Sequence, residues 1–431
     1  MLQTQQGNSK PFKTTTFVCI PIMKTEIHTL ANGLRLLHLP GGVDVAHAAL
    51  YINAGTRDER PEEHGIAHFI EHAIFKGTHK RKAFHILNRL ENVGGDLNAY
   101  TAKEETCIYA SFLSQHMERA IELFADLVFN SVFPEKEIEK EKHVVIDEID
   151  AYKDNPQEEI MDAFEDSFFE GHALGKRILG TKKSVKSLNA DKIKSFTARH
   201  YIPGNMLLCT SGNVAFKKVI YWASKYIAPE TEQIESLART TFTDYIPFDT
   251  TKKYSNYQSH CIIGVPGYSM FHPKRTGLSL LNNLLGGPAM SSRLNMKIRE
   301  KYGYTYIIES NYQTYTDAGL NHIYFGTEAS KQAKVEELTL LELKNLRDKK
   351  LGSIQLHNAR QQFAGQMAIS AESNSGKMLS FGKHYLHHNS LLSMDELFKL
   401  IYSVTADELM EIANEIFQPS LFSYLKFVPK K

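Results

Sequence analysis

The chain of 431 residues and 48.9 kDa is long enough for about two to four domains of ordinary size. Its 50 Lys and Arg residues nearly balance 49 Asp and Glu residues, which excludes the strongly basic charge typical of proteins that bind nucleic acids. Apolar residues make up 42% of the chain, as in folded globular proteins, yet runs such as Ala48–Ile52 are far shorter than the ~20 residues that cross a bilayer. The composition therefore also excludes an integral membrane protein.

The cysteines are scattered along the chain and form no CxxC pair. They are Cys19, Cys107, Cys209 and Cys261. A disulfide scaffold or a thiolate zinc ribbon needs closer, paired cysteines. We therefore expect reduced thiols in a cytoplasmic protein.

The first half of the chain is predicted to form one α+β unit after an N-terminal extension. Residues 1–22 are polar and Thr-rich and lack the features of a signal peptide. The pair Asn32-Gly33 is a strong signal for the turn of a β-hairpin. In chain order we expect strands over 26–30, 34–39 and 45–53, helices over 65–75 and 83–93, a hairpin over 97–112, and helices over 117–129 and 134–152.

The second half repeats this order after a polar segment, residues 229–253, that contains Pro229 and Pro247 and is predicted to be a linker. We expect a strand over 258–265, helices over 277–285 and 291–300, strands over 304–313 and 321–328, and a helix over 330–346. The sequence thus predicts an α+β fold of two homologous domains, 23–228 and 254–431, each an antiparallel-rich sheet packed with helices.

The segment His68-Phe69-Ile70-Glu71-His72 carries a candidate metal site. On a helix, His68 and His72 are four residues apart, so both imidazoles project from one face toward a single ion. Glu71 lies beside that face and is placed to polarise a metal-bound water. The pattern H-x-x-E-H is the signature of the inverzincin zinc peptidases. His64 extends the same stripe and is a rival ligand, although one helix rarely supplies three zinc ligands.

Two histidines leave a zinc ion short of a third protein ligand, which we expect on another rigid element. The helix predicted over 134–152 carries Glu141 and Glu148, seven residues and two turns apart on one face. One of these carboxylates would bind the metal, and the other would orient a ligand or the water.

Four segments resemble the pitrilysin (insulinase) family of zinc peptidases: Gly65–His72, Phe75–Thr78, Leu97–Thr101 and Val144–Ile149. The two-unit chain is similar to the shorter members of this family, the branch of the mitochondrial processing peptidase and its beta subunit. The resemblance implies one zinc ion per chain with His68, His72 and Glu148 as ligands. It also implies Glu71 as the general base and Glu141 as a supporting carboxylate.

The second copy is predicted to bind substrate instead of metal. Aligning Gly65 with Gly277 places Leu280, Asn283 and Leu284 where His68, Glu71 and His72 stand in the first copy. Residues 291–306 resemble the stretch where the family places an Arg/Tyr pair that grips substrate. We favour Arg293 and Tyr306 for this pair, with Arg299 or Tyr304 as alternatives. Asn98, on the hairpin predicted over 97–112, is expected to help position an extended peptide.

We therefore expect a zinc metalloendopeptidase that hydrolyses peptides or unfolded polypeptide segments. Each chain would form half of a clamshell, and a homodimer would close the chamber. One alternative is a catalytically silent scaffold subunit of the same fold, and another is a peptidase that needs a partner chain for the Arg/Tyr half-site. We also expect residues 1–240 alone to bind metal without cleaving peptides.

Overall fold

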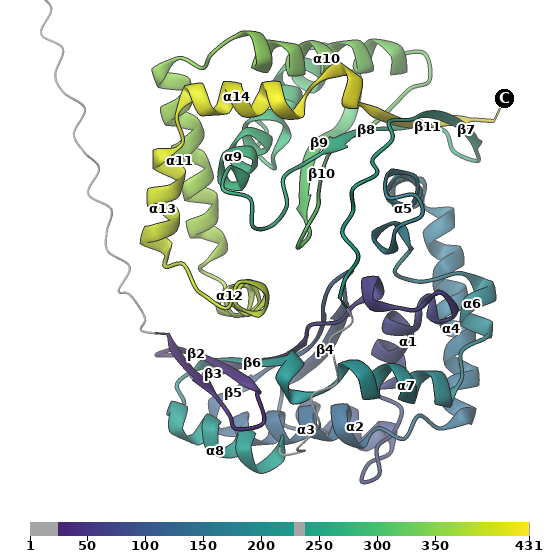
Figure 1. Cartoon of the computed structure of the whole chain (residues 1–431), viewed down its shortest axis with the longest axis vertical. Coiled ribbons are helices and arrows are strands. Elements are labelled where there is room, and N and C mark those ends of the chain that lie inside the picture. Colours follow the sequence, from purple (N-terminus) through teal and green to yellow (C-terminus); the bar gives the residue numbers. More distant parts are fainter. Residues whose placement is uncertain (1–24, 228–237, 431) are drawn as a thin grey trace, which may run out of the picture.

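The structure, a computed structural model, describes residues 25–227 and 238–430. The expected N-terminal extension, residues 1–22, and the first part of the expected linker lie outside the described residues. Two β-sheets lie in separate halves of the molecule, with helices around and between them (Figure 1). This mixed α/β architecture confirms the predicted fold class.

The first sheet contains six strands within the described residues, in the order β1-β2-β6-β3-β5-β4. The pairing of β2 with β6 is parallel, and the other pairings are antiparallel. Gly33, with a φ of 85°, forms the turn between β1 and β2, as the Asn-Gly signal predicts. The strands are β1 (Glu26–Thr29), β2 (Arg35–Pro40), β3 (Val45–Ile52), β4 (Asp96–Thr101), β5 (Thr106–Leu113) and β6 (Met206–Gly212).

The second sheet has the order β7-β11-β8-β10-β9 and repeats the first sheet without β1. Its only parallel pair within the described residues, β7 with β11, corresponds to the parallel pair β2 with β6. The strands are β7 (Asp249–Tyr254), β8 (Ser259–Pro266), β9 (Thr305–Thr314), β10 (Gly319–Thr327) and β11 (Ser423–Pro429). The common strand order supports the predicted internal repeat.

Strand β7 corrects the predicted linker, because it lies almost entirely inside residues 229–253. Its sequence, DTTKKY, lacks apolar residues at alternate positions. β7 is the edge strand of its sheet and most of its side chains are exposed, so it needs no apolar face. Its backbone pairing with β11 therefore could not be predicted from hydrophobic patterning.

The helices largely follow the predicted periodicity, although the one predicted over 291–300 contains a π-helical stretch, Asn295–Glu300. Within the described residues, no helix is long and apolar enough to cross a membrane. The helices of the first half are α1 (Ile66–Ala73), α2 (Ala83–Glu91), α3 (Met117–Asn130), α4 (Glu135–Asp154), α5 (Pro156–Phe168), α6 (Lys182–Lys186), α7 (Ala190–His200) and α8 (Phe216–Tyr226). Those of the second half are α9 (Arg275–Gly286), α10 (Gln332–Asp348), α11 (Ser353–Ser370), α12 (Asn374–His388), α13 (Met394–Ser403) and α14 (Ala406–Ile416).

Each half lends one helix to the sheet of the other half. Helix α5 packs on β8 and β11, and α12 packs on β3 and β6 (Figure 1). Phe164 and Phe168 of α5 join a buried cluster with side chains of the second sheet, and Met378 and Tyr385 of α12 join one with side chains of the first. Since α12 covers one face of β3 and the core helices cover the other, nearly the whole of β3 is buried. The two halves are therefore interlocked.

Helix α1 is held between the first sheet and α4, and this placement builds the site. Its apolar residues Ile66, Phe69 and Ile70 are fully buried in the core of the first half. That spacing turns His68 and His72 toward α4, which packs against α1.

Candidate metal centre

The N-cap position of helix α1 is Gly65, which has a left-handed φ of 87° and no side chain to cap the helix. The carboxylate of Glu59 accepts the backbone N–H groups of Gly65 and Ala67 instead, each at 2.9 Å. Glu59 is buried, and burial raises its pKa to about 8 against the opposing effect of these two hydrogen bonds. Glu59 could not be predicted from the sequence, because it lies outside the helix and belongs to no local pattern.

His64 stands before α1 and is not one of the three residues grouped as possible metal ligands in the described part of the chain. Its Nε2 atom lies 3.1 Å from the carbonyl oxygen of Arg177. Burial lowers its pKa. The left-handed Gly65 ends the helical stripe, so the rival ligand considered from sequence is separated from the site.

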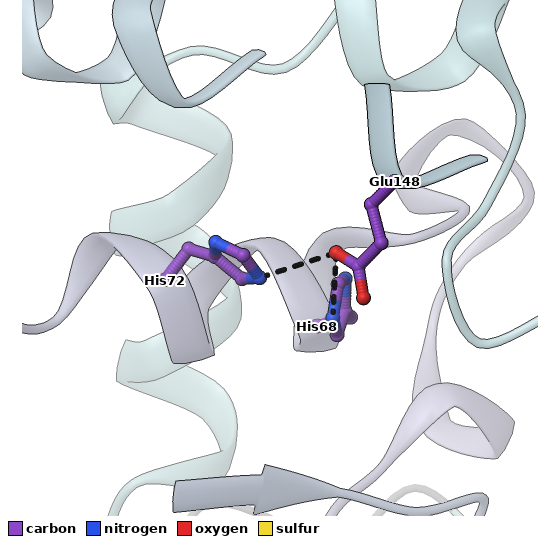
Figure 2. A group of neighbouring side chains, drawn as sticks. All are labelled: His68, His72 and Glu148. Carbon is purple, nitrogen blue, oxygen red and sulfur yellow. Dashed lines mark ion pairs between the residues drawn. The ribbon is translucent and has the colours of Figure 1, made fainter. Parts of the chain in front are cut away.

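The imidazoles of His68 and His72 and the carboxylate of Glu148 converge on one point between α1 and α4 (Figure 2). The Oε2 atom of Glu148 lies 3.7 Å from Nε2 of His68 and 3.5 Å from Nε2 of His72. Their potential ligand atoms all lie within 4.8 Å of one another. In the described residues this is the one group of three or more His, Cys, Asp or Glu side chains arranged in this way.

These side chains fit a zinc ion in spacing and in the chemistry of their donor atoms. Zinc binds His nitrogen and carboxylate oxygen at roughly 2.0–2.2 Å, so two ligands of a tetrahedral ion lie about 3.5 Å apart. Oε2 of Glu148 is buried and has no hydrogen-bond donor among the described residues, although it faces two imidazoles. Burial lowers the pKa of His68 to about 4, whereas the ionic interaction between His72 and Glu148 lowers the pKa of Glu148 and raises that of His72. A neutral imidazole and a carboxylate are the forms that bind zinc.

Glu141 lies on the far side of His72 from Glu148. Its Oε2 atom is 3.3 Å from Nδ1 of His72, and its Oε1 atom is 2.7 Å from Nζ of Lys76. A proton on Nδ1 of His72 would bind Glu141 and leave Nε2 free to face the metal position. Glu141 therefore lies where the sequence analysis expects the supporting carboxylate.

Glu71 borders an open pocket of about 270 Å³ beside the converging ligands. Desolvation raises the pKa of its carboxyl group, and hydrogen bonding to Thr101 of β4 partly offsets this effect. Asn98 lies on the wall of the same pocket, on the exposed side of β4. Strand β4 is an edge strand of the first sheet, so the backbone groups along its outer edge are not paired with another strand of that sheet.

Within the described residues, no contact joins Arg293 or Tyr306, the favoured substrate-gripping pair, to the metal ligands. The guanidinium of Arg293 lies 3.9 Å from Glu342 of α10, and its Nη1 atom is buried. Tyr306 lies on β9, an edge strand of the second sheet, and is 78% exposed. The guanidinium of Arg299 lies over the ring of Tyr306, 5.5 Å from its centre. The geometry thus pairs Tyr306 with Arg299, one of the alternatives left open by the sequence.

The second copy has an amide network on the helix that corresponds to α1. In α9, Leu280 and Asn283 are buried. The neighbouring Asn282 donates to the carbonyl of Ser310 at 2.9 Å and accepts from Asn321 at 2.9 Å. Aliphatic and amide side chains here supply no zinc-binding imidazole or carboxylate.

Comparison with known proteins identifies the family. Residues 41–182 match the family described as insulinase (peptidase family M16), and residues 187–363 match the peptidase M16 inactive domain. An uncharacterized zinc protease of Bacillus subtilis, YmxG, is 33% identical over 398 residues, which cover 90% of this chain and 95% of that protein. The chain belongs to peptidase family M16. An uncharacterized zinc protease of Rickettsia bellii is 34% identical over 402 residues and covers 92% of this chain and 96% of its own length.

Solved structures share the M16 fold over nearly the whole chain. A protease from Helicobacter pylori superposes with a TM-score of 0.86 at 22% identity and covers 95% of this chain and 100% of its own. The structure titled peptidase M16 inactive domain from Pseudomonas fluorescens has a TM-score of 0.88 at 18% identity, with coverages of 94% and 98%. The match to the insulinase domain contains His68, Glu71, His72, Glu141 and Glu148, and the match to the inactive domain contains Arg293, Arg299 and Tyr306.

Proposed function

We propose that this M16 chain is a zinc metalloendopeptidase that holds one zinc ion through His68, His72 and Glu148. The observation that carries the proposal is the convergence of two Nε2 atoms on the buried Oε2 atom of Glu148, at 3.7 and 3.5 Å. A divalent cation at this point would take both imidazole nitrogens and the carboxylate oxygen as ligands, which accounts for their convergence.

Zinc bound here would supply a Lewis acid for the substrate carbonyl and would lower the pKa of water. Glu71 would act as general base: its carboxylate accepts the proton of the attacking water and returns it to the amine of the leaving peptide. Desolvation raises its pKa above that of an ordinary carboxyl group, which makes it a better base near neutral pH. The pocket beside Glu71 gives a substrate side chain room to lie against Phe75 and Leu87.

An extended peptide would bind as an added strand along the outer edge of β4, with Asn98 beside it. We propose Tyr306, together with Arg293 or with Arg299, as the substrate-gripping residues of the second half. Tyr306 projects from an exposed edge strand and its ring stacks on the guanidinium of Arg299, which lies in the preceding helical stretch, whereas Arg293 lies near Glu342. We propose that two copies of the chain form a homodimer that closes a chamber around the substrate.

The thiols of Cys107, Cys209 and Cys261 are buried and free, which supports a cytoplasmic location for the protein.

The alternative is a silent scaffold subunit of the same fold. A scaffold does not need two imidazoles and a carboxylate whose possible ligand atoms all lie within 4.8 Å of one another, whereas a zinc site does. The intact set of ligands, base and supporting carboxylate therefore favours an enzyme.

Metal analysis of the purified chain, combined with peptide cleavage in the presence and absence of a chelator, tests the proposal. We expect one zinc per chain and cleavage that stops when zinc is removed. Glu148→Ala should lose zinc, whereas Glu139→Ala, on an exposed position of the same helix, should retain it. Two zinc ions per chain, or full zinc retention by Glu148→Ala, would contradict the ligand assignment.

A further inference from the structure

The two histidines of the metal centre are supported unequally. Nδ1 of His68 is buried and has no hydrogen-bond partner among the described residues. Nδ1 of His72 lies 3.3 Å from Oε2 of Glu141. A histidine that binds a metal through one nitrogen is usually oriented by a hydrogen bond at the other nitrogen. In this site that support rests on Glu141.

Glu141 in turn depends on a lysine that the motif does not include. The side chain of Glu141 is only 8% exposed, so its two carboxylate oxygens rely on partners within the protein. Nζ of Lys76 lies 2.7 Å from Oε1, while Oε2 faces His72. Lys76 lies three residues beyond the end of α1 and four residues after His72, and its backbone N–H donates to the carbonyl of Ala73 at 3.1 Å. The same chain segment therefore carries both the proposed metal ligand His72 and Lys76, the cation that pairs with the supporting carboxylate Glu141.

We infer that Lys76 is a positioning residue for the metal centre. Its ammonium group fixes the Glu141 carboxylate so that Oε2 accepts the Nδ1 proton of His72, and this bond aims Nε2 of His72 at the ion. The inference rests on the proposed zinc function. A buried carboxylate anchored at one oxygen by a charged hydrogen bond has one favoured orientation, whereas without the anchor it can turn toward water in the neighbouring pocket.

A competing role for Lys76 is direct contact with substrate, because its side chain is 30% exposed and lies on the wall of the pocket beside Glu71. The two roles differ in what they change. A positioning residue changes the affinity for zinc in the absence of any peptide. A residue that only contacts substrate changes the KM for peptides and leaves the zinc affinity as it is.

The test compares the zinc dissociation constants of Lys76→Met, Lys76→Arg and Lys142→Met, measured by competition with a chelator and without peptide. We expect zinc binding by Lys76→Met to be weaker on the order of tenfold, as for other losses of ligand support. Lys76→Arg keeps a cation and should stay near the wild type. Lys142→Met is the matched control, because Lys142 is a mostly buried lysine of α4 that pairs with Glu139 instead of Glu141.

Circular dichroism and thermal unfolding of the apoproteins separate loss of fold from loss of positioning. Wild-type zinc affinity in folded Lys76→Met would overturn the inference, and a raised KM in that variant would assign Lys76 to substrate contact. Equal weakening in Lys76→Met and Lys142→Met would also overturn it, because the effect would then be a general one. Failure of the wild-type chain to bind zinc would instead refute the proposed function on which the inference rests.

Discussion

The carboxylate of Glu59 supplies the cap that α1 lacks at its own N-terminus. Gly65 occupies the cap position, and the N–H groups of Gly65 and Ala67 both bind Glu59. Helix α1 has only eight residues and carries two of the proposed ligands, so its first turn is a large part of the site. The capping carboxylate therefore stabilises the fold and the metal centre together.

We predict that Glu59→Ala lowers the free energy of unfolding by about 1–3 kcal/mol, because it leaves two N–H groups without their acceptor. Glu59→Gln keeps an acceptor oxygen and should lose less. Denaturant unfolding of both variants measures the effect, and the exposed neighbour Glu62 provides the control variant Glu62→Ala. Equal stability of Glu59→Ala and Glu62→Ala would contradict the capping role.

At the same scale, the sequence predicted those site residues that follow helical spacing. His68 and His72 are one turn apart on α1, and Glu141 and Glu148 are two turns apart on α4, so local periodicity was sufficient to place each pair on one face. Glu59 and the stacking of Arg299 on Tyr306 depend on tertiary contacts, which periodicity does not encode. Lys76 stands four residues after His72, and that spacing was the signal that could have revealed it.

At the scale of elements, the exchange of α5 and α12 depends on two glycines in close contact with aromatic rings. A Cβ atom at Gly382 of α12 would lie 2.4 Å from the ring of Tyr51, and one at Gly264 of β8 would lie 2.4 Å from the ring of Phe164. The hydroxyl of Tyr51 also donates to the carbonyl of Leu379 at 2.7 Å. A contact between a glycine and an aromatic ring thus lets each of these helices pack closely on the sheet of the other half.

Gly382→Ala should lower the free energy of unfolding by about 1–3 kcal/mol, because the added methyl group overpacks the contact with Tyr51. Gly365→Ala is the control: Gly365 lies within α11 and a Cβ atom there meets nothing within 4 Å. That substitution should be neutral or stabilise by up to about 1 kcal/mol. Thermal unfolding of the two variants checks both signs, and a stabilised Gly382→Ala would contradict the close packing.

Most elements were predictable because apolar residues repeat with the period of a helix or a strand. Strand β7 was not, since an exposed edge strand has no apolar face. The packing of α5 and α12 on the sheet of the opposite half was not predictable from the sequence pattern either. A helix that packs on a distant sheet shows the same periodicity as one that packs on its own half, so the pattern predicts the helix without its partner.

At the scale of the whole molecule, buried charges also join the halves. Arg57 binds Asp317, in the turn between β9 and β10, through two contacts of 2.6 and 2.7 Å. It also binds Glu104, in the turn between β4 and β5, at 2.7 Å. The contacts with Asp317 and the packing of α12 on the first sheet would be absent from residues 1–240 alone, the fragment that we expect to bind metal without cleaving peptides. Without α12, the buried side chains Tyr51 and Cys107 would face water.

The contact between Glu105 and α12 predicts how stability depends on pH. Glu105 is buried and pairs with Lys383 and with Nε2 of His387 at 3.4 Å. Burial alone would raise the pKa of Glu105, but these α12 partners outweigh it and lower the pKa below the usual carboxyl value. A lowered pKa contributes stability above the unfolded value, near 4.3, and this contribution is lost as the pH falls through the folded pKa.

Glu105→Gln should therefore cost about 2 kcal/mol at pH 7 and progressively less below about pH 4. Denaturant unfolding of the wild type and of Glu105→Gln, once at pH 7 and once below about pH 4, measures this cost in the free energy of unfolding. The exposed pair of Lys350 and Asp407 provides the control Asp407→Asn, for which we expect little change at either pH. A cost for Glu105→Gln that stays constant across this range would contradict the assignment of the effect to the ionised carboxylate.

The central claim is that the group formed by His68, His72 and Glu148 holds zinc while Glu71 performs the proton transfer. The most direct test measures zinc content and peptide cleavage side by side in wild type and Glu71→Gln. The amide keeps the shape of the side chain but cannot accept a proton, so zinc content should stay at one per chain while turnover falls on the order of 10²–10⁴-fold. Turnover by Glu71→Gln near the wild-type rate, with zinc bound, would contradict the account.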